Sequence, residues 1–290
     1  MDPSQVADQP DAPPPPMAPD RGALPSTPGP PHTSPPPFVF ALGRVEPRFP
    51  SLALEKEFAQ ASGRAETAGQ TDRQVLHSVL ADRANRYLAR QMCWVLTIEG
   101  LDTYILLPRD PADVELLIEA IRPGSGDLDV DVVIGVRGPI APPDACSGLL
   151  VPVVVFDQLY SFDRGELIRE IPRPEDIPDE EFDATAAELF DRIMQIADNA
   201  GAIDEHRALN YLAVRYPAIY ARTAESYRAE YSLSGIDVRP SRLSGARKVA
   251  DVVLSFTHRR TDVTERYFTR VDVSSEWPFL VTKLSPFFER

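Results

Sequence analysis

The sequence has few of the residues that usually carry metal binding or nucleophilic catalysis. Its 290 residues include only two cysteines and four histidines. Two cysteines are too few for the disulfide scaffold of a small secreted domain, and the chain contains no CxxC, HExxH or HxxxH spacing. We therefore expect neither a metal site nor a bound cofactor.

Positive charge and long apolar runs are also scarce. The chain has 30 basic and 44 acidic residues, a net charge of -14 and a pI of about 4.8. This balance argues against sequence-independent nucleic-acid binding, which needs a basic surface. No apolar run reaches the length of a membrane span, and the acidic N-terminus does not resemble a signal peptide. We predict a cytoplasmic protein, with its cysteines reduced and no membrane partner.

Motifs for phosphate binding and for serine hydrolysis are missing as well. The two glycines of GVRGP (residues 135–139) are followed by proline, so we interpret them as a tight turn. Cys93 lies in an apolar run typical of a core, whereas Cys146 lies in a polar loop. If one of the two thiols acted together with a histidine, the protein would be a cryptic cysteine hydrolase. However, no nearby cation is visible in the sequence that would lower the pKa of either thiol.

The N-terminal segment has the composition of a disordered tail. Residues 1–37 hold 14 of the 30 prolines and almost no large apolar side chains. Such a segment cannot bury enough surface to offset its ordering entropy. We predict a disordered spacer rich in polyproline II, with a ligand for a proline-binding domain as the alternative.

Residues 38–171 alternate apolar strands with helical segments. At their centre, residues 91–108 (QMCWVLTIEGLDTYILLP) predict a β-hairpin that turns at Glu99-Gly100. The other expected strands are 38–45, bounded by Pro47 and Pro50, and the runs from Asp129 and Leu149. Helices are expected at 52–61, 72–89, 112–121 and 165–171. This pattern predicts a mixed α/β sheet module.

Prolines and acids at residues 172–180 predict a domain boundary at 172. Two helices are expected after it, at 180–200 and from Asp204, with Pro217 kinking or breaking the second. From Tyr231 the apolar period changes to two, which predicts four strands in an antiparallel meander. The overall class is α+β: an N-terminal mixed α/β sheet module (38–171), followed by a helix pair packed on an antiparallel β-meander (172–290).

Charged side chains are dense in the first ordered residues. They form either a surface ion-pair lattice or a set of charged hydrogen bonds that fixes an extended partner. On the second interpretation, the candidate peptide-binding residues are Arg44, Arg48, Glu55, Arg64, Glu66 and Arg73.

Long strings of this sequence resemble the C-terminal region of the PatG-type cyanobactin maturation proteases. They cover residues 40–77, 85–123, 131–163, 204–220 and 237–290, nearly the whole ordered chain. In that family a subtilisin-like protease domain precedes this region. The chain has no counterpart of that domain, so no triad residue transfers to it.

The resemblance implies a non-catalytic accessory protein of ribosomal peptide biosynthesis. Such a protein would bind the precursor peptide, by strand addition at a sheet edge or in a groove, and present it to a maturation protease or modifying enzyme. The alternative is an assembly scaffold that docks a separate subtilisin-like protease. A homodimer is also compatible with the resemblance.

Overall fold

The computed structural model describes residues 37–63, 69–123, 129–171, 177–196, 198–243 and 245–288. The predicted disordered tail lies outside these ranges except for Pro37, and the boundary predicted at residue 172 lies outside them too. Both stay predictions.

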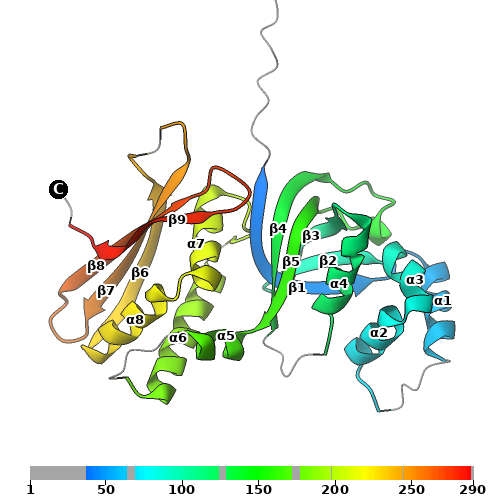
Figure 1. Ribbon diagram of the computed structural model, residues 1–290, viewed down its shortest axis with the longest axis horizontal. Coiled ribbons are helices and arrows are strands. Elements are labelled where there is room, and N and C mark those ends of the chain that lie inside the picture. Colours follow the sequence, from blue (N-terminus) through cyan, green and yellow to red (C-terminus); the bar gives the residue numbers. More distant parts are fainter. Residues whose placement is uncertain are drawn as a thin grey trace, which may run out of the picture. The chain divides into compact units, whose positions relative to one another are not determined.

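The first half of the fold is a five-stranded closed barrel (Figure 1). Its strands are β1 (Phe38–Arg48), β2 (Cys93–Ile98), β3 (Leu101–Pro108), β4 (Asp129–Ile140) and β5 (Pro152–Asp163). They follow the order β1-β2-β3-β5-β4, and β4 pairs with β1 to close the ring. Only β3 and β5 run parallel. Closure leaves the barrel without an edge strand, because every strand has two neighbours.

The predicted hairpin is confirmed and forms β2 and β3. Glu99 and Gly100, which connect them, have φ values of 50° and 78°, the left-handed pair that a two-residue hairpin turn requires. The break expected at Pro47 is wrong, because β1 continues through Pro47 to Arg48. This half of β1 pairs only with β2, because β4 pairs with residues 38–43. The N–H that Pro47 lacks is therefore not needed for a hydrogen bond to a second neighbouring strand.

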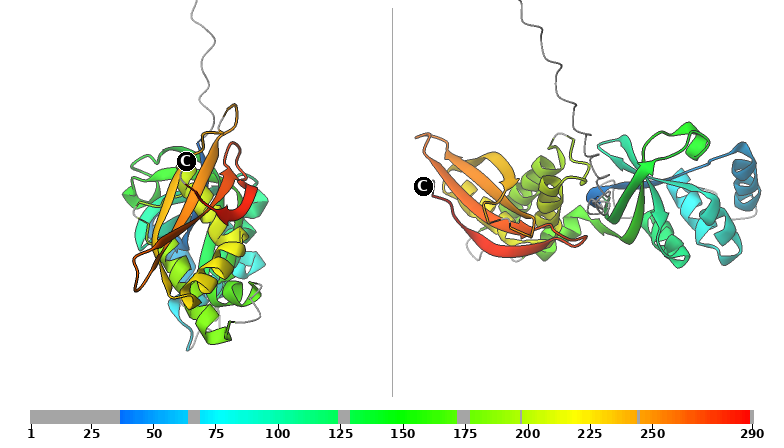
Figure 2. Two further views of the ribbon diagram at one scale, coloured as in Figure 1. Left: turned by 90° about the vertical axis from the view of Figure 1, so that its left-hand side faces the viewer. Right: turned by 90° about the horizontal axis from the view of Figure 1, so that it is seen from above.

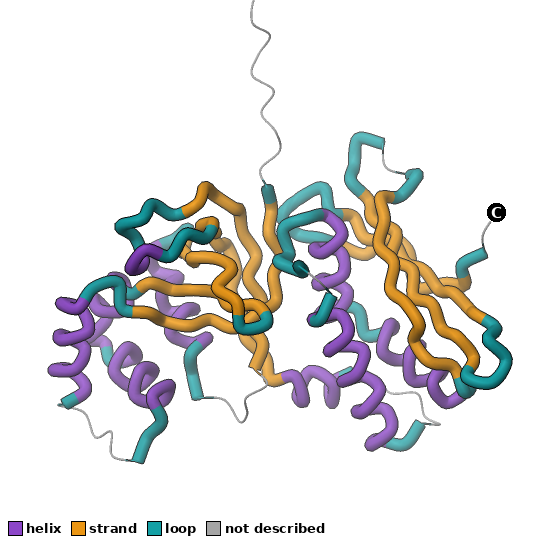
Figure 3. The backbone as a smooth tube through the Cα atoms, turned by 180° about the vertical axis from the view of Figure 1, so that it is seen from behind, coloured by secondary structure: helices purple, strands orange, loops and turns teal. Residues whose placement is uncertain are grey.

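Four helices pack beside the barrel: α1 (Leu52–Ser62), α2 (Asp72–Ala81), α3 (Arg86–Gln91) and α4 (Val114–Ala120). Figure 3 shows them gathered at one side of the strands. Their apolar faces share a core with alternate barrel residues such as Leu96, Leu106 and Phe156. The single helix expected at 72–89 is wrong, since α2 ends at Ala81 and a short 3-10 turn (Arg83–Asn85) separates it from α3.

The second half of the fold consists of helices on an open sheet (Figure 2). The helices are α5 (Arg164–Glu170), α6 (Asp179–Met194), α7 (Asp204–Arg215) and α8 (Ala218–Arg228). The strands are β6 (Tyr231–Pro240), β7 (Val249–His258), β8 (Thr264–Asp272) and β9 (Phe279–Pro286). Their order β6-β7-β8-β9, antiparallel throughout, confirms the meander and the α+β class. Pro217 breaks the last predicted helix into α7 and α8, so the expected helix pair is a trio.

One apolar core joins the two halves. Phe40 and Leu42 of β1 belong to the same buried cluster as Phe182 of α6 and Val252 of β7. At the junction the N–H of Phe40 donates to the carbonyl of Gly201 at 2.9 Å. Gly201 has a φ of 67°, and a Cβ there would lie 2.2 Å from the Phe40 carbonyl oxygen. Only glycine therefore fits this junction.

Candidate functional site

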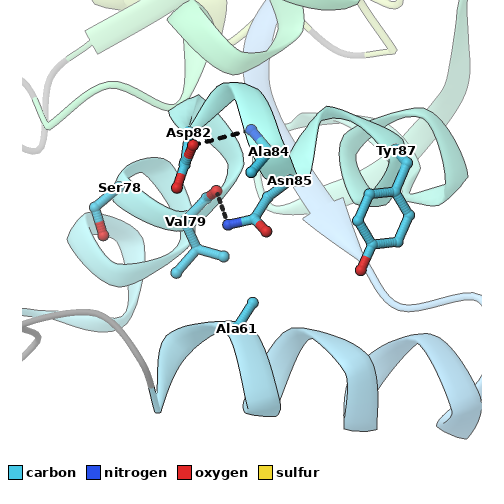
Figure 4. A pocket seen from close by; sticks show the side chains of 7 residues that line it. All are labelled: Ala61, Ser78, Val79, Asp82, Ala84, Asn85 and Tyr87. Carbon is cyan, nitrogen blue, oxygen red and sulfur yellow. Dashed lines mark hydrogen bonds between the residues drawn. The ribbon is translucent and has the colours of Figure 1, made fainter.

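A cleft of about 500 Å³ opens between α1 and the α2–α3 segment. Figure 4 shows its lining: Ala61 faces it from α1, and the Tyr87 side chain extends toward α1 from the opposite wall. The other lining residues come from the end of α2 and from the turn that follows: Ser78, Val79, Asp82, Ala84 and Asn85. This volume is in the range of small-ligand pockets.

The break between α2 and α3 creates this cleft. Asp82 accepts a hydrogen bond from the N–H of Ala84 at 2.9 Å and so caps the 3-10 turn. Asn85 donates from Nδ2 to the carbonyl of Val79 at 3.0 Å, which satisfies an acceptor at the end of α2. Both bonds are drawn in Figure 4. They turn the chain so that Tyr87, in the first turn of α3, lines the cleft.

The cleft combines apolar, aromatic and polar lining residues. Ala61 and Val79 are buried and give it an apolar floor. Tyr87 is 46% exposed and offers an aromatic wall, while Ser78, Asp82 and Asn85 form a polar rim. Asp82 is the single ionisable carboxylate among the lining residues, so the lining offers no pair of carboxylates for acid–base work.

Arg48, a predicted contact residue, pairs with a carboxylate of the barrel instead of standing free. Its guanidinium makes a two-pronged ion pair with Asp102, with both N–O distances at 2.6 Å, and lies 3.5 Å from Glu46. These contacts join the end of β1 to the start of β3. The arrangement fits the ion-pair lattice that was the alternative interpretation of this segment.

The other predicted contacts are spread over several elements. Arg44 is half-buried in β1, and Glu55 is exposed in the first turn of α1. Arg73 of α2 donates to the carbonyl of Ala120 at 2.8 Å and so ties α2 to α4. Arg64 and Glu66 lie outside the described residues. Glu55 and Arg73 thus sit on the two helices that flank the cleft, and the peptide-binding role of all six stays a prediction.

The two cysteines form a disulfide bond. Cys93 of β2 and Cys146 of the β4–β5 connection have their Cα atoms 5.4 Å apart. The expectation of two reduced thiols is therefore wrong for this structure. The cysteine hydrolase interpretation is wrong for the same reason, because a bonded sulfur is no nucleophile. The two residues meet because the β4–β5 connection folds back across β2, a contact that their separation of 53 residues does not announce.

A second polar cluster lies at the junction of the two halves. Arg207 of α7 is 2% exposed and donates to the carbonyls of Val273 (2.7 Å), Ser275 and Glu276 (3.3 Å). The Glu276 carboxyl lies beside the carboxyl of Asp157 on β5. Burial and this neighbouring carboxylate raise the pKa of Glu276 to about 7. The cluster fastens the β8–β9 connection to α7 and β5.

The described ranges contain neither a metal-ligand cluster nor a membrane-spanning helix. Among those residues, no three His, Cys, Asp or Glu side chains gather as metal ligands. No helix of the described chain is long and apolar enough to cross a membrane.

A closed barrel sharing its core with a helix-backed meander defines a two-part α+β protein with a cleft beside the barrel. Residues 176–287 match the family described as PatG C-terminal. A solved structure named "PatG Domain of Unknown Function" has the same fold, with a TM-score of 0.70 and 20% sequence identity. The alignment covers 86% of this chain and 98% of that one. No curated protein matches the chain. These findings confirm the resemblance to the C-terminal region of PatG.

The cleft was not predicted from the sequence, although a signal for it exists. Asp82 and Asn85 lie inside the run interpreted as one helix, and both residue types favour caps and turns over helix interiors. Their spacing could have marked the break that opens the cleft. No comparable signal pairs Cys93 with Cys146.

Proposed function

We propose that this protein is a non-catalytic accessory factor of a cyanobactin-like peptide pathway. It binds the precursor peptide and presents it to a maturation protease or another modifying enzyme. The cleft between α1 and α2–α3 receives a side chain of the peptide. The observation that carries the proposal is the cleft itself, with its apolar floor, its exposed Tyr87 wall and its polar rim.

Two further observations support a groove over strand addition. The barrel is closed, so it offers no edge to an incoming strand. Aromatic walls are favoured in recognition sites because they bring large contact area with little loss of conformational entropy. The relation to PatG supports the choice of a ribosomal peptide as the ligand.

Calorimetry with a cyanobactin-type precursor peptide tests the proposal. We expect a dissociation constant in the micromolar range, about -8 kcal/mol. Tyr87→Ala removes the aromatic wall and Ser78→Arg fills the cleft, and each should weaken binding about tenfold or more. Tyr227→Ala is the matched control, because Tyr227 is similarly exposed (38%) but lies on α8. Absence of binding at tens of micromolar would contradict the proposal.

Docking of a separate subtilisin-like protease is the second candidate, and the match of residues 176–287 to a PatG family favours it. It predicts co-purification with the pathway protease in the absence of peptide. Deletion of residues 1–37 distinguishes a contact on the folded part, which survives, from one through the tail. A protease that binds while the peptide does not would select this candidate over the first.

A further inference from the structure

The segment between β4 and β5, residues 141–151, forms a strap over one face of the barrel. Beneath it lie Cys93, Val95 and Ile105, all buried, on the face of β2 and β3 opposite to the one that packs on α1–α4. Leu149 and Val151 of the strap pack against these residues. The strap therefore covers an apolar surface that would otherwise face water.

Besides its two ends and this packing, the strap has two specific attachments at its middle. The first is the Cys93–Cys146 disulfide. The second is Ser147, whose hydroxyl lies 3.1 Å from the carbonyl of Phe49 and 3.2 Å from that of Pro50. Cys146 and Ser147 have φ values of 46° and 56°, a left-handed backbone that non-glycine residues adopt only at a cost. The disulfide holds this unfavourable conformation, so its loss lets the strap relax.

The second attachment leads directly to the wall of the cleft. Phe49 and Pro50 immediately precede Ser51, the N-cap of α1, whose side chain accepts from the N–H of Leu54 at 3.3 Å. The Phe49 ring also packs on Phe58 of α1, with the ring centroids 5.2 Å apart. Ser147 thus fixes the residues that start α1, and α1 carries Ala61 of the cleft. The disulfide, the Ser147 hydrogen bonds and the start of α1 therefore form a continuous series of contacts.

We propose that the Cys93–Cys146 disulfide is a redox-sensitive latch that holds the strap and, through Ser147, the α1 wall of the cleft. Reduction frees the strap, and α1 then opens more readily. The latch itself is independent of the function proposed above; only its consequence for ligand affinity rests on that function.

A dithiol supplies the two electrons that the reduction needs. One of its thiolates attacks the sulfur of Cys146, the half-buried partner; the protein S–S bond breaks, and the Cys93 thiolate leaves and takes up a proton. The second dithiol sulfur then attacks the mixed disulfide and releases Cys146, which is also protonated. The products are two protein thiols and one oxidised dithiol. Attack at Cys93 is disfavoured because this residue is 4% exposed.

Hydrogen exchange of the full chain, oxidised and reduced, tests the latch without any ligand. The oxidised protein should show no free thiol, and the reduced protein two. On reduction, exchange in residues 141–151 should accelerate about tenfold and in residues 49–62 about fivefold, while α6 stays unchanged. Two free thiols that persist after treatment with oxidised glutathione, or unchanged exchange in residues 49–62 after reduction, would overturn the proposal.

Two variants separate the steps of the connection. Cys146→Ser should reproduce the reduced pattern in both segments. Ser147→Ala keeps the disulfide and should accelerate exchange in residues 49–62 much more than in the strap. Ser234→Ala is the matched control, because its hydroxyl also donates to a carbonyl, that of Ser255 at 3.1 Å, but it lies on β6. A Ser147→Ala protein with wild-type exchange in α1 counts against the connection.

The effect on ligand binding is measured separately, by calorimetry with the precursor peptide in both redox states. A severalfold weaker affinity after reduction supports the full proposal. If α1 exchange accelerates while no peptide binds in either state, the latch stands and the proposed function fails. If the peptide binds equally in both states and α1 exchange does not change, the proposed function stands and the latch fails.

Discussion

The two halves of the molecule protect their strands in different ways. The barrel has no edges because its ring is closed. The sheet β6–β9 is open, and side chains from the helices bond to backbone groups of its two edge strands. Arg192 donates to the carbonyl of Leu233 on β6 at 2.5 Å, and Tyr216 accepts from the N–H of Leu284 on β9 at 2.8 Å. Lys283, exposed on β9, further discourages pairing with another strand. Strand addition is therefore disfavoured on both halves, which favours a groove.

The family match and the larger cleft lie in different halves of the molecule. The family match lies in the second half, at residues 176–287. The larger cleft lies in the first half, about 500 Å³ against about 210 and about 10 Å³ for two pockets of the second. The disulfide belongs to the first half too. The residues matched to the family therefore do not include those that line the larger cleft.

The largest expected effect comes from removing the disulfide with Cys93→Ser and Cys146→Ser together. A bond across 53 residues restricts the unfolded chain by about 4 kcal/mol on a chain-entropy estimate. Urea unfolding should show this loss. The two tryptophans report the halves separately, since Trp94 is buried in β2 and Trp277 is in the β8–β9 connection. Because one core joins the halves, both probes should shift together; a shift at Trp94 alone would break that inference.

Arg207→Met should cost about 3 kcal/mol, because it leaves three carbonyls of the β8–β9 connection without their charged donor. Arg122→Met is the control. Arg122 makes an exposed ion pair with Glu119, and its loss should cost less than about 0.5 kcal/mol. Thermal unfolding of the three proteins measures the difference. Equal midpoints for Arg207→Met and the wild type would show that the junction does not depend on this guanidinium.

Periodicity predicted most of the elements, and it failed where distant parts of the chain meet. The meander from Tyr231 and the hairpin at 91–108 follow from local alternation and turn residues. Barrel closure depends on β4 returning to β1, a pairing between residues about ninety positions apart that leaves no local trace. The same holds for the disulfide. The predicted contact residues that the structure describes are not among those lining the cleft. The contacts that occupy Arg48 and Arg73 also leave no local trace in the sequence.

Arg48→Met tests whether the two-pronged contact to Asp102, which links β1 to β3, contributes to the stability of the barrel. Because the pair is partly exposed, we expect a loss of only about 1 kcal/mol. The loss should shrink at high salt, since screening weakens the pair but not an apolar contact. Peptide affinity should be measured on the same variant. If the barrel stays stable but the peptide binds at least tenfold more weakly, Arg48 contributes to peptide binding.

The last expected effect is a pH dependence at Glu276, a carboxylate at the junction of the halves. Burial and Asp157 raise its pKa from 4.5 to about 7 in the folded protein. Between these two values the folded state binds more protons at this position than the unfolded state does. Stability therefore falls as pH rises through this window, and the contribution is lost above about pH 7. Glu276→Gln keeps a neutral donor beside Asp157, so its stability relative to the wild type should rise between pH 5 and pH 8.

Glu119→Gln is the control for this experiment, because Glu119 is exposed and lies on the barrel side. Denaturant midpoints at several pH values, for the wild type and both variants, give the comparison. A Glu276→Gln protein whose pH profile parallels that of the wild type would mean that the carboxylate pair does not hold its proton in the folded state. In that case the apolar core and the Phe40–Gly201 hydrogen bond would join the two halves without a contribution from the Glu276 proton.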